Sequence, residues 1–348
     1  MNLNTFMVIV TYNSSDFIEK CLNSIDNPKN RNYFLAVIDN NSKDNTAVKV
    51  QSFVRSSDKL SNDNFKFIKL KRNIGFASAV NYAVFNFLIK QKAELFKDFR
   101  YLLLLNPDVI LEKQSIYNLL ETFKWGSSNR GNSSNSSNSS LNKPDNRVGA
   151  AGGLIYEYDK SKIQHAGGAF KDNLITYHLI TPPRPDPIYQ VSYATGAFFA
   201  TELSLFKNLG GFDSGYRPAY FEELDYCFKI QKMGFNVAVN TEAKAMHYGT
   251  ASVKKFSSDF YRYYHKNRIR CAVLNMSLPY LLKKFIPAEL KWLKNEATKD
   301  QYISLLYSYF LNFLFLPYNL IVKIKNHLRF YVLKLKRNSS QEGKWERK

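Results

Sequence analysis

Short apolar segments alternate with amphipathic segments over the first third of the chain. Residues 6–10 are all apolar, runs of the same kind stand at 34–38 and 101–105, and a run at 65–70 that includes two lysines also reads as a strand. An apolar run of this length is typical of a strand buried on both faces of a parallel sheet. Residues 75–90, between the third and fourth runs, have the composition of a helix. Strands and helices that alternate in this order predict an α/β fold with a parallel sheet.

The same pattern continues after an interruption. Residues 126–147 are nearly all Ser and Asn, which predicts a disordered surface insertion, because such a segment buries too little apolar surface to order itself. Beyond it, residues 149–158 and 191–201 read as strands. Near the start, Ser14 and Asp16 are typical helix-capping residues, and the amphipathic stretch that follows ends near Ile25.

Polar side chains follow three of the predicted strands. Thr11, Asp39 and Asp108 each come directly after, or end, an apolar run. In an open α/β sheet the ligand crevice lies beyond the carboxyl ends of the strands, so we expect these residues to meet there. Asp39 suits the N–H groups of a nucleobase, and Asp108 suits Mg²⁺, which takes one or two protein carboxylates together with substrate phosphates. Turn formation is the alternative for each of them.

An acidic cluster supplies a second kind of chemistry. Glu222, Glu223 and Asp225 lie within four residues and are flanked by aromatic residues. Repulsion and partial burial raise the pKa of clustered carboxyl groups, which produces a general base that works near neutral pH. The alternative is a helix N-terminus, where acids favour the macrodipole. A helix start that faces a cleft satisfies both interpretations.

Two further segments offer weaker signals. Gly75, in the segment 73–81 with several small residues, would let the backbone approach a phosphate or a sugar. His247 is a possible metal ligand, although a single histidine is more often structural, and His165 could contact substrate. The chain has neither GxGxxG nor GxxxxGK[ST], which leaves Rossmann-cofactor and P-loop functions without support.

Composition changes the picture only through charge. The 348 residues carry 49 Lys and Arg against 29 Asp and Glu, which gives a formal net charge of +20. Residues 254–348 hold 20 of these basic residues but only six of the acidic ones.

Cys21, Cys227 and Cys271 lie far apart, which argues against a disulfide scaffold or a cysteine zinc site and favours a reducing compartment. Without a basic segment and a long apolar core at the N-terminus, we expect a cytoplasmic protein.

The basic C-terminal region allows three interpretations. Residues 302–322 hold no charge and are bracketed by lysines, but Asn312, Pro317 and Asn319 make the segment a poor membrane span. We favour amphipathic helices at an anionic membrane surface, with Lys and Arg at the headgroups. A buried helical hairpin is the second interpretation, and nucleic-acid binding is the third, disfavoured by the apolar character.

Taken in chain order, seven short motifs resemble the family 2 glycosyltransferases of GT-A fold, and especially their rhamnosyltransferase-like branch. They are VIVTYN at 8–13, VIDNNS at 37–42, NIGFA at 73–77, LNPDV at 105–109, GGFD at 210–213, FEELDYCFK at 221–229 and HYG at 247–249. The resemblance implies a mixed sheet with helices on both faces over residues 1–256. The helical, basic, amphipathic extension at 257–348 lies outside it.

The resemblance also implies an inverting, metal-dependent sugar transfer. Asp108 and His247 would hold Mg²⁺ or Mn²⁺, and Glu223 would be the catalytic base, with Glu222 and Asp225 shaping its environment. The nucleotide sugar would contact the residues Thr11, Tyr12, Asn13, Asp39, Asn41, Asn73, Gly75, Phe76, Asn106 and Asp108. The acceptor would contact the residues Trp125, Gly196, Ala197, Phe212 and Asp213.

This chain departs from the family pattern at three places. Its metal motif is Asn-Pro-Asp instead of Asp-x-Asp, its base is Glu223 where Asp is commoner, and Lys229 replaces an Arg that could bind bidentately. Deoxythymidine-diphosphate rhamnose is the first expected donor, with uridine-diphosphate sugars (galactose, galactofuranose or GlcNAc) as the alternative. The expected acceptor is a lipid-linked oligosaccharide or a polysaccharide of the bacterial cell surface, glycosylated at the inner face of the plasma membrane.

Two other classes of function compete with this one. A sugar nucleotidyltransferase shares the fold, but it would normally carry a glycine-rich loop with Arg and Lys after the first strand, where this chain has TYNSS. A non-catalytic protein that binds membranes or nucleic acid gives no reason for Asp108, Glu223 and His247 to stand in this arrangement. No nucleic-acid partner is expected, and the oligomeric state is left open.

Overall fold

The computed structural model describes residues 5–25, 33–57, 64–97, 99–125, 147–249 and 257–342. Its strands are β1 Thr5–Thr11, β2 Tyr33–Asp39, β3 Phe65–Lys69, β4 Tyr101–Leu105, β5 Val109–Leu111, β6 Val148–Glu157, β7 Ile163–His165, β8 Gly168–Phe170, β9 Thr176–His178, β10 Ile188–Gln190, β11 Phe198–Glu202 and β12 Asn236–His247. The predicted insertion at 126–147 lies, apart from Arg147, outside the described residues.

Helices alternate with strands in the first half of the chain, separate β11 from β12, and follow β12 to the end of the described residues. They are α1 Ile18–Ser24, α2 Thr46–Ser56, α3 Phe76–Asn81, α4 Ala93–Phe96, α5 Ser115–Glu121, α6 Leu203–Leu209, α7 Glu222–Lys232, α8 Ser258–Asn275, α9 Leu278–Tyr280, α10 Ile286–Asn295, α11 Lys299–Leu314 and α12 Leu316–Glu342. Two π-helical segments, η2 Tyr82–Gln91 and η5 Leu281–Phe285, continue α3 and α9, and a short 3₁₀ turn, η3 Thr122–Lys124, follows α5.

The main sheet has the order β10-β12-β6-β11-β4-β1-β2-β3. In addition, β5 pairs with β12 and β7 pairs with β6, whereas β8 and β9 form a separate hairpin. Strands β4, β1, β2 and β3 are parallel neighbours, whereas β11 runs antiparallel to both β4 and β6. All seven residues of β1 and of β2 are buried, which is why both strands are apolar except at their ends. The predicted α/β fold with a mixed sheet is confirmed.

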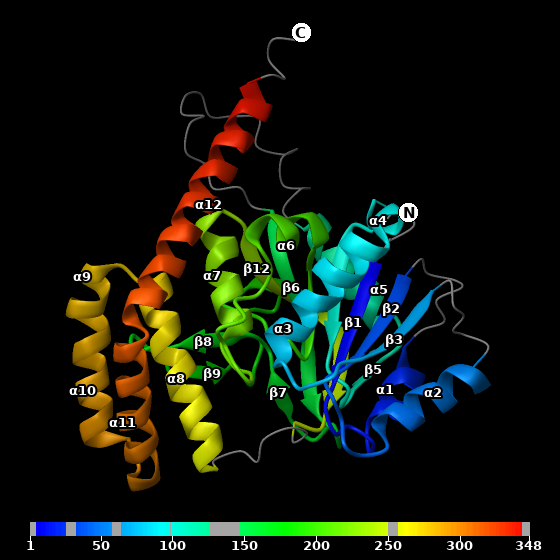
Figure 1. Cartoon of the computed structure of the whole chain (residues 1–348), viewed down its shortest axis with the longest axis horizontal. Helices are drawn as coiled ribbons and strands as arrows, with labels where there is room; N and C mark the ends of the chain where they lie inside the picture. Colours follow the sequence, from blue (N-terminus) through cyan, green and yellow to red (C-terminus); the bar gives the residue numbers. More distant parts are fainter. Residues whose placement is uncertain are drawn as a thin grey trace.

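The core has two parts, one on each face of the sheet. One face packs against α3, η2, α6 and α7, and the other packs against α1, α2 and α5. Figure 1 shows these helices around the sheet, with α8, α10 and α11 grouped beside it and α12 projecting past the body. Helices therefore cover both faces, as the GT-A fold requires.

One predicted strand needs correction, and the uncharged C-terminal stretch divides into two helices. In the segment 191–201, strand β11 begins only at Phe198, and Tyr193 reaches the β8 strand through an isolated bridge instead of a ladder. The uncharged stretch 302–322 is broken at Phe315, where α11 ends and the chain turns by 65° into α12. Neither of these two helices, taken singly, has the length and apolar character of a membrane span, whereas the bent pair has both.

Hydrogen bonds and an ion pair connect residues on the two sides of the predicted boundary at residue 256. Helix α8 lies against the segment before α7, where Asn267 Nδ2 donates to the carbonyls of Ala219 and Tyr220 over 2.8 and 3.1 Å. Arg270, also on α8, forms an ion pair with Asp213 at 2.6 Å. The first helix of the C-terminal region is thus part of the wall that surrounds the sheet's carboxyl ends.

Candidate functional site

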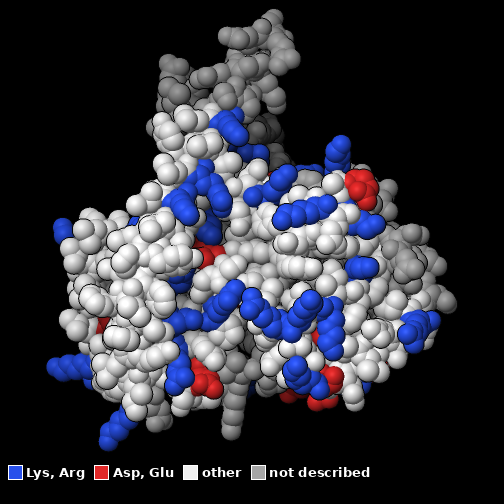
Figure 2. Space-filling view, viewed as in Figure 1, with Lys and Arg blue, Asp and Glu red and all other residues white. Residues whose placement is uncertain are grey.

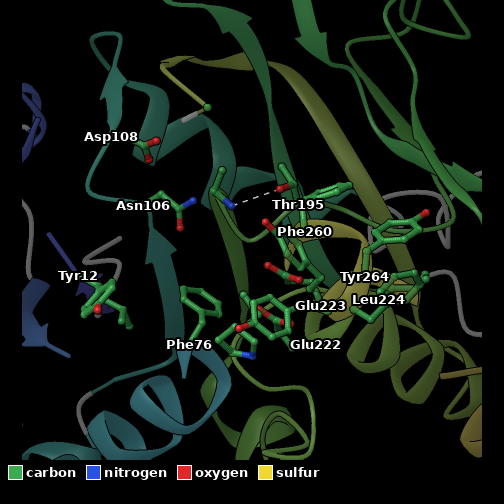
Figure 3. A pocket seen from close by; sticks show the side chains of 18 of the residues that line it. Tyr12, Phe76, Asn106, Asp108, Thr195, Glu222, Glu223, Leu224, Phe260 and Tyr264 are labelled. Atoms are coloured by element: carbon green, nitrogen blue, oxygen red, sulfur yellow. Dashed lines mark hydrogen bonds between the residues drawn. The ribbon is translucent and has the colours of Figure 1, made fainter. Parts of the chain in front are cut away.

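A cavity of about 840 Å³ opens at the carboxyl ends of β1 and β4. One side of it is lined by Tyr12, Asn106 and Asp108, which follow those strands, and the other side is lined by α7 and α8. In Figure 3, Glu222 and Glu223 lie between Asp108 and Asn106 on one side and Tyr264 on the other. The topology therefore brings together residues that are up to about 250 positions apart, and Asp108 lies at the strand-end cavity as predicted.

Five of the expected nucleotide-sugar residues line this cavity. They are Tyr12, Asn73, Phe76, Asn106 and Asp108. Asn73 is fixed by a neighbour, because its Oδ1 accepts from Asn40 Nδ2 at 2.9 Å and from the Gly75 amide at 2.9 Å. Gly75 itself has φ +83°, and a Cβ there would stand 2.9 Å from the carbonyl oxygen of Pro218. Glycine is needed at this position because the Pro218 carbonyl, on the opposite wall of the cavity, leaves no space for a side chain.

Thr11 and Asp39 do not reach the cavity in this structure, which corrects the expectation that they line it. Both are fully buried. The Asp39 carboxylate accepts hydrogen bonds from the Thr11 hydroxyl at 3.1 Å and from the hydroxyl and the amide of Ser42. A buried carboxylate with this many donors is satisfied in place. Asp39 therefore holds the ends of β1 and β2 together beneath Tyr12.

Asn13 and Asn41 support the same loops without lining the cavity. Both have positive φ, 51° and 67°, which asparagine tolerates better than most residues. Asn13 Oδ1 accepts from the Lys43 amide at 2.8 Å, and the Asn13 amide donates to Ser42 Oγ at 2.9 Å. Their contribution is to the shape of the strand-end loops.

Asp108 and His247 form the candidate metal centre. Asp108 Oδ1 lies 3.3 Å from His247 Nε2, and both side chains line the cavity. His247 Nδ1 lies 2.6 Å from Gln164 Oε1, whose amide nitrogen reaches Glu157 at 3.2 Å. This orientation makes Nδ1 the donor, so the lone pair of a neutral ring at Nε2 faces the Asp108 carboxylate. Only a cation or a proton satisfies two acceptors that face each other.

This donor set fits a divalent cation that the substrate helps to bind. Among the described residues, no three His, Cys, Asp or Glu side chains gather as a complete metal cage. Mg²⁺ and similar ions need no such cage, since they take one or two carboxylates and complete their shell with water and phosphate oxygens. Asp108 and His247 supply an incomplete shell of this kind.

Glu223 and Glu222 stand at the start of α7. Glu223 Oε1 accepts from the Gly196 amide at 3.2 Å, and a side chain at Gly196 would collide with that carboxylate. Burial raises the pKa of Glu223 from 4.5 to about 7. Burial, and then the charge of Glu223, raise the pKa of Glu222 well above its usual range. Within the described part of the chain, Glu222 Oε2 has no hydrogen-bond partner. The sequence prediction of a carboxyl with a raised pKa is confirmed.

Asp225 does not belong to this pair, which corrects its expected place beside the base. It is fully buried and does not line the cavity. Its carboxylate forms an ion pair with Lys229 at 2.8 Å and accepts from Tyr216 OH at 3.2 Å and Asn275 Nδ2 at 2.7 Å. Positions two apart on a helix point to nearly opposite sides, so Asp225 faces away from Glu223 and ties α7 to Asn275 of α8.

Three of the expected acceptor residues also lie elsewhere. Trp125 packs against the core on the far face of the sheet, and Phe212 is buried among Phe76, Phe206 and Tyr226. Asp213 is paired with Arg270. Gly196 and Ala197 are placed as expected, because Gly196 contacts Glu223 and Ala197 lines the cavity.

The cavity wall beside Glu223 is built mainly from residues that we did not assign to the site. The aromatic ones are Tyr193, Phe260, Tyr263 and Tyr264, and Thr176 and His178 join them from β9, next to Tyr220 from the segment 212–223 that we did expect there. Phe260 stacks on Tyr264 at 5.6 Å and meets Tyr220 edge-on at 5.4 Å. The density of aromatic residues at 260–264 was the available signal, and we had assigned it to membrane contact. His165 lies beneath, fully buried, with its ring 4.6 Å from that of His178.

Comparison with known proteins gives a family for part of the chain. Residues 6–140 match the model described as glycosyl transferase family 2. A poly-beta-1,6-N-acetyl-D-glucosamine synthase from Staphylococcus aureus (strain MSSA476) is 30% identical over 120 residues, which are 34% of this chain and 25% of that protein. The chain thus spans about a quarter of the length of the curated relatives it matches.

Solved structures agree on the fold. GalNAc-T7, crystallised with UDP, GalNAc and Mn²⁺, superposes with a TM-score of 0.57 at 17% identity over 84% of this chain and 56% of that chain. S. aureus TarS 1-349 in complex with UDP-GlcNAc gives 0.51 at 16% identity over 88% and 79%. At these identities the likeness shows the GT-A fold and not the substrate.

Proposed function

On the premise that residues 6–140 belong to a family 2 glycosyl transferase domain, we propose that this chain transfers a sugar from a nucleotide diphosphate to a hydroxyl group, with inversion at the anomeric carbon. One observation carries the proposal. The Asp108–His247 pair and the Glu223 carboxyl line the same cavity, at the carboxyl ends of the central strands. A metal site and a base on one cavity are what this reaction needs.

Glu223 is the proposed base. It removes the proton from the acceptor hydroxyl as that oxygen forms its bond to the anomeric carbon and the bond to the diphosphate breaks. A pKa of about 7 leaves about half of the carboxyl groups ionised at neutral pH, so the group both accepts a proton readily and is present in its basic form. The Gly196 amide fixes the direction of Oε1.

Asp108 and His247 are the proposed holders of Mg²⁺ or Mn²⁺. A cation bound there would neutralise the charge that develops on the departing diphosphate. Tyr12, Asn73 and Asn106 line the same side of the cavity, which suits the nucleotide and the sugar. Gln164 fixes the ring of His247, so it supports the site from behind.

The finer identity of the substrates rests on the relatives. TarS binds UDP-GlcNAc, and the curated relative is named for poly-beta-1,6-N-acetyl-D-glucosamine. These names favour a UDP-N-acetylhexosamine as the first donor to test, ahead of the rhamnose donor expected from the sequence motifs. The proposed acceptor is a surface polysaccharide or its lipid-linked precursor, and the proposed place of reaction is the inner face of the plasma membrane.

A thermal-shift screen tests the donor side directly. UDP, UDP-GlcNAc, UDP-galactose and deoxythymidine-diphosphate rhamnose are each added with Mn²⁺, with Mg²⁺ and with EDTA. A ligand at about 100 times its Kd stabilises the native state by about 2.7 kcal/mol, enough to raise the Tm by several degrees. We expect a metal-dependent shift for one nucleotide class that Asp108→Asn removes. No shift with any of them, or an equal shift in Asp108→Asn, contradicts the proposal.

A further inference from the structure

Helix α11 has its polar side turned toward the protein. Ser304, Ser308 and Asn312 follow one another at intervals of four and are all buried. Each donates a hydrogen bond to a backbone carbonyl of α8, over 3.3, 3.4 and 2.9 Å. In Figure 1, α8 lies between α11 and the sheet. The surface by which α11 attaches to the body is therefore a stripe of hydroxyl and amide groups.

The opposite side of α11 is apolar and faces outward. Ile303, Phe310 and Phe313 have exposed fractions of 78%, 62% and 77%. A helix on the surface of a water-soluble protein shows the reverse arrangement, with the apolar stripe facing the core. Polar interhelical contacts with apolar side chains outward are instead typical of helices packed in lipid.

Helix α12 repeats this inversion with cations. Three basic residues of α12 donate to backbone carbonyls at the C-terminal ends of other helices. Lys323 donates to Met276, just after α8, at 2.6 Å, and Arg329 donates to Leu209, the last residue of α6, at 2.7 Å. Arg337 donates to Met233, just after α7, at 2.9 Å. A cation at a helix C-terminus satisfies orphan carbonyls and complements the macrodipole. The outward residues are again large and apolar, namely Leu320, Ile321, Ile324, Leu328, Tyr331, Val332 and Leu335, all at least 44% exposed.

We propose that this outer face, the exposed apolar side chains of α11 and α12, is embedded in the interfacial layer of an anionic membrane. A contiguous apolar surface of this kind marks a binding site. Exposed lysines stand beside it, at positions 325, 334 and 336 on α12 and at 283, 284, 291 and 294 on η5 and α10. Apolar side chains flanked by lysines suit acyl chains below anionic headgroups.

Charge also disfavours a second copy as the occupant. Residues 254–348 carry 20 basic and six acidic residues, so two such faces placed together would repel each other. Figure 2 shows few acidic side chains among the basic ones on the face it draws. Because neither α11 nor α12 is by itself long and apolar enough to span a bilayer and the two meet at 65°, the proposal is a helix pair lying in the interface. It does not depend on the proposed enzymatic activity.

Vesicle flotation of the full chain tests this proposal. Vesicles of phosphatidylcholine alone are compared with vesicles that contain phosphatidylglycerol as well. The test variant is Phe310→Ser/Phe313→Ser, and the matched control is Val48→Ser/Ile180→Ser, which removes two apolar side chains that are 61% and 67% exposed elsewhere. Circular dichroism and the Tm check that both variants are folded.

We expect the wild type and the control to float with the anionic vesicles, and the test variant to partition at least about tenfold less. Flotation of the test variant equal to that of the wild type overturns the proposal. So does absence of wild-type flotation with either vesicle. Light scattering tests the alternative that a second copy of the chain covers the outer face. If the wild type is a dimer, the test variant is a monomer and neither binds vesicles, the outer face is assigned to a second copy and the membrane proposal is overturned.

Discussion

Replacing Glu223 by Gln removes the proposed base while keeping its size. Loss of a positioned general base typically lowers a rate by about 10²- to 10⁴-fold, and we expect a loss in this range. Nucleotide binding should be retained, because the base acts on the acceptor and the nucleotide side is lined by other residues. In the wild type, kcat/KM should rise with pH through about 7, from about a tenth of its plateau at pH 6 to about nine tenths at pH 8.

The same substitution should stabilise the protein by an amount that grows as the pH rises from about 4.5 and levels off above about 7. Burial raises the pKa of Glu223 from 4.5 to about 7, so between these values the folded state binds more protons than the unfolded state. Stability from this group is therefore present below about pH 4.5 and is lost as the pH rises through 7. The difference of about 2.5 pKa units corresponds to at most about 3 kcal/mol, less where water reaches the partly exposed carboxylate.

Two measurements separate these effects. Sugar transfer is followed from pH 5.5 to 8.5, and urea unfolding is compared at pH 5 and pH 8 for the wild type, Glu223→Gln and a control, Glu242→Gln, which changes an exposed carboxyl on β12. Substantial activity in Glu223→Gln, or a flat wild-type profile between pH 6 and 8, refutes its role as base. A Glu223→Gln stability gain that is equal at the two pH values refutes the assigned cause of the raised pKa.

Three other substitutions test how the walls of the site are held. Arg268→Ala breaks the buried ion pair between α8 and α10 and should cost about 3–5 kcal/mol in urea unfolding, whereas Arg262→Ala, at an exposed pair, should cost less than about 1 kcal/mol. Asn267→Ala frees the backbone before α7 and should raise the acceptor KM while leaving the donor KM unchanged; equal changes in both would contradict its place on the acceptor side. Gly168→Ala places a methyl group against the Tyr193 ring and should lower stability by about 1–3 kcal/mol, seen as a lower Tm.

The local pattern of apolar and polar residues was sufficient to predict the elements whose residues are close in sequence. The buried strands β1, β2 and β4 are unbroken apolar runs, because a strand covered on both faces has no solvent side to mark with polar residues. The strand-end position of Asp108 and the acidic start of α7 were likewise readable, since the rule that ligands bind at strand ends applies whatever the remaining sequence is.

The local pattern did not predict which residues line the cavity. Asp39 was expected to face the ligand, but Thr11 from β1 and Ser42 from its own loop both donate hydrogen bonds to its carboxylate. Phe212 and Asp213 were expected at the acceptor, and the fold uses them for packing and for an ion pair. A residue's type states which bonds it can make, whereas its neighbours in space decide which of these are already made.

The C-terminal region shows the division most clearly. The sequence alone determined that residues 254–348 are basic, helical and rich in apolar residues. Only the tertiary structure decided which side of each helix faces the body. Ser308 and Lys323 donate to backbone carbonyls of α8, whereas Phe313 is exposed. Periodicity along a helix distinguishes a polar side from an apolar side, but it does not say which of the two faces the protein body. That depends on the segments against which the helix packs, and these lie far away in the sequence.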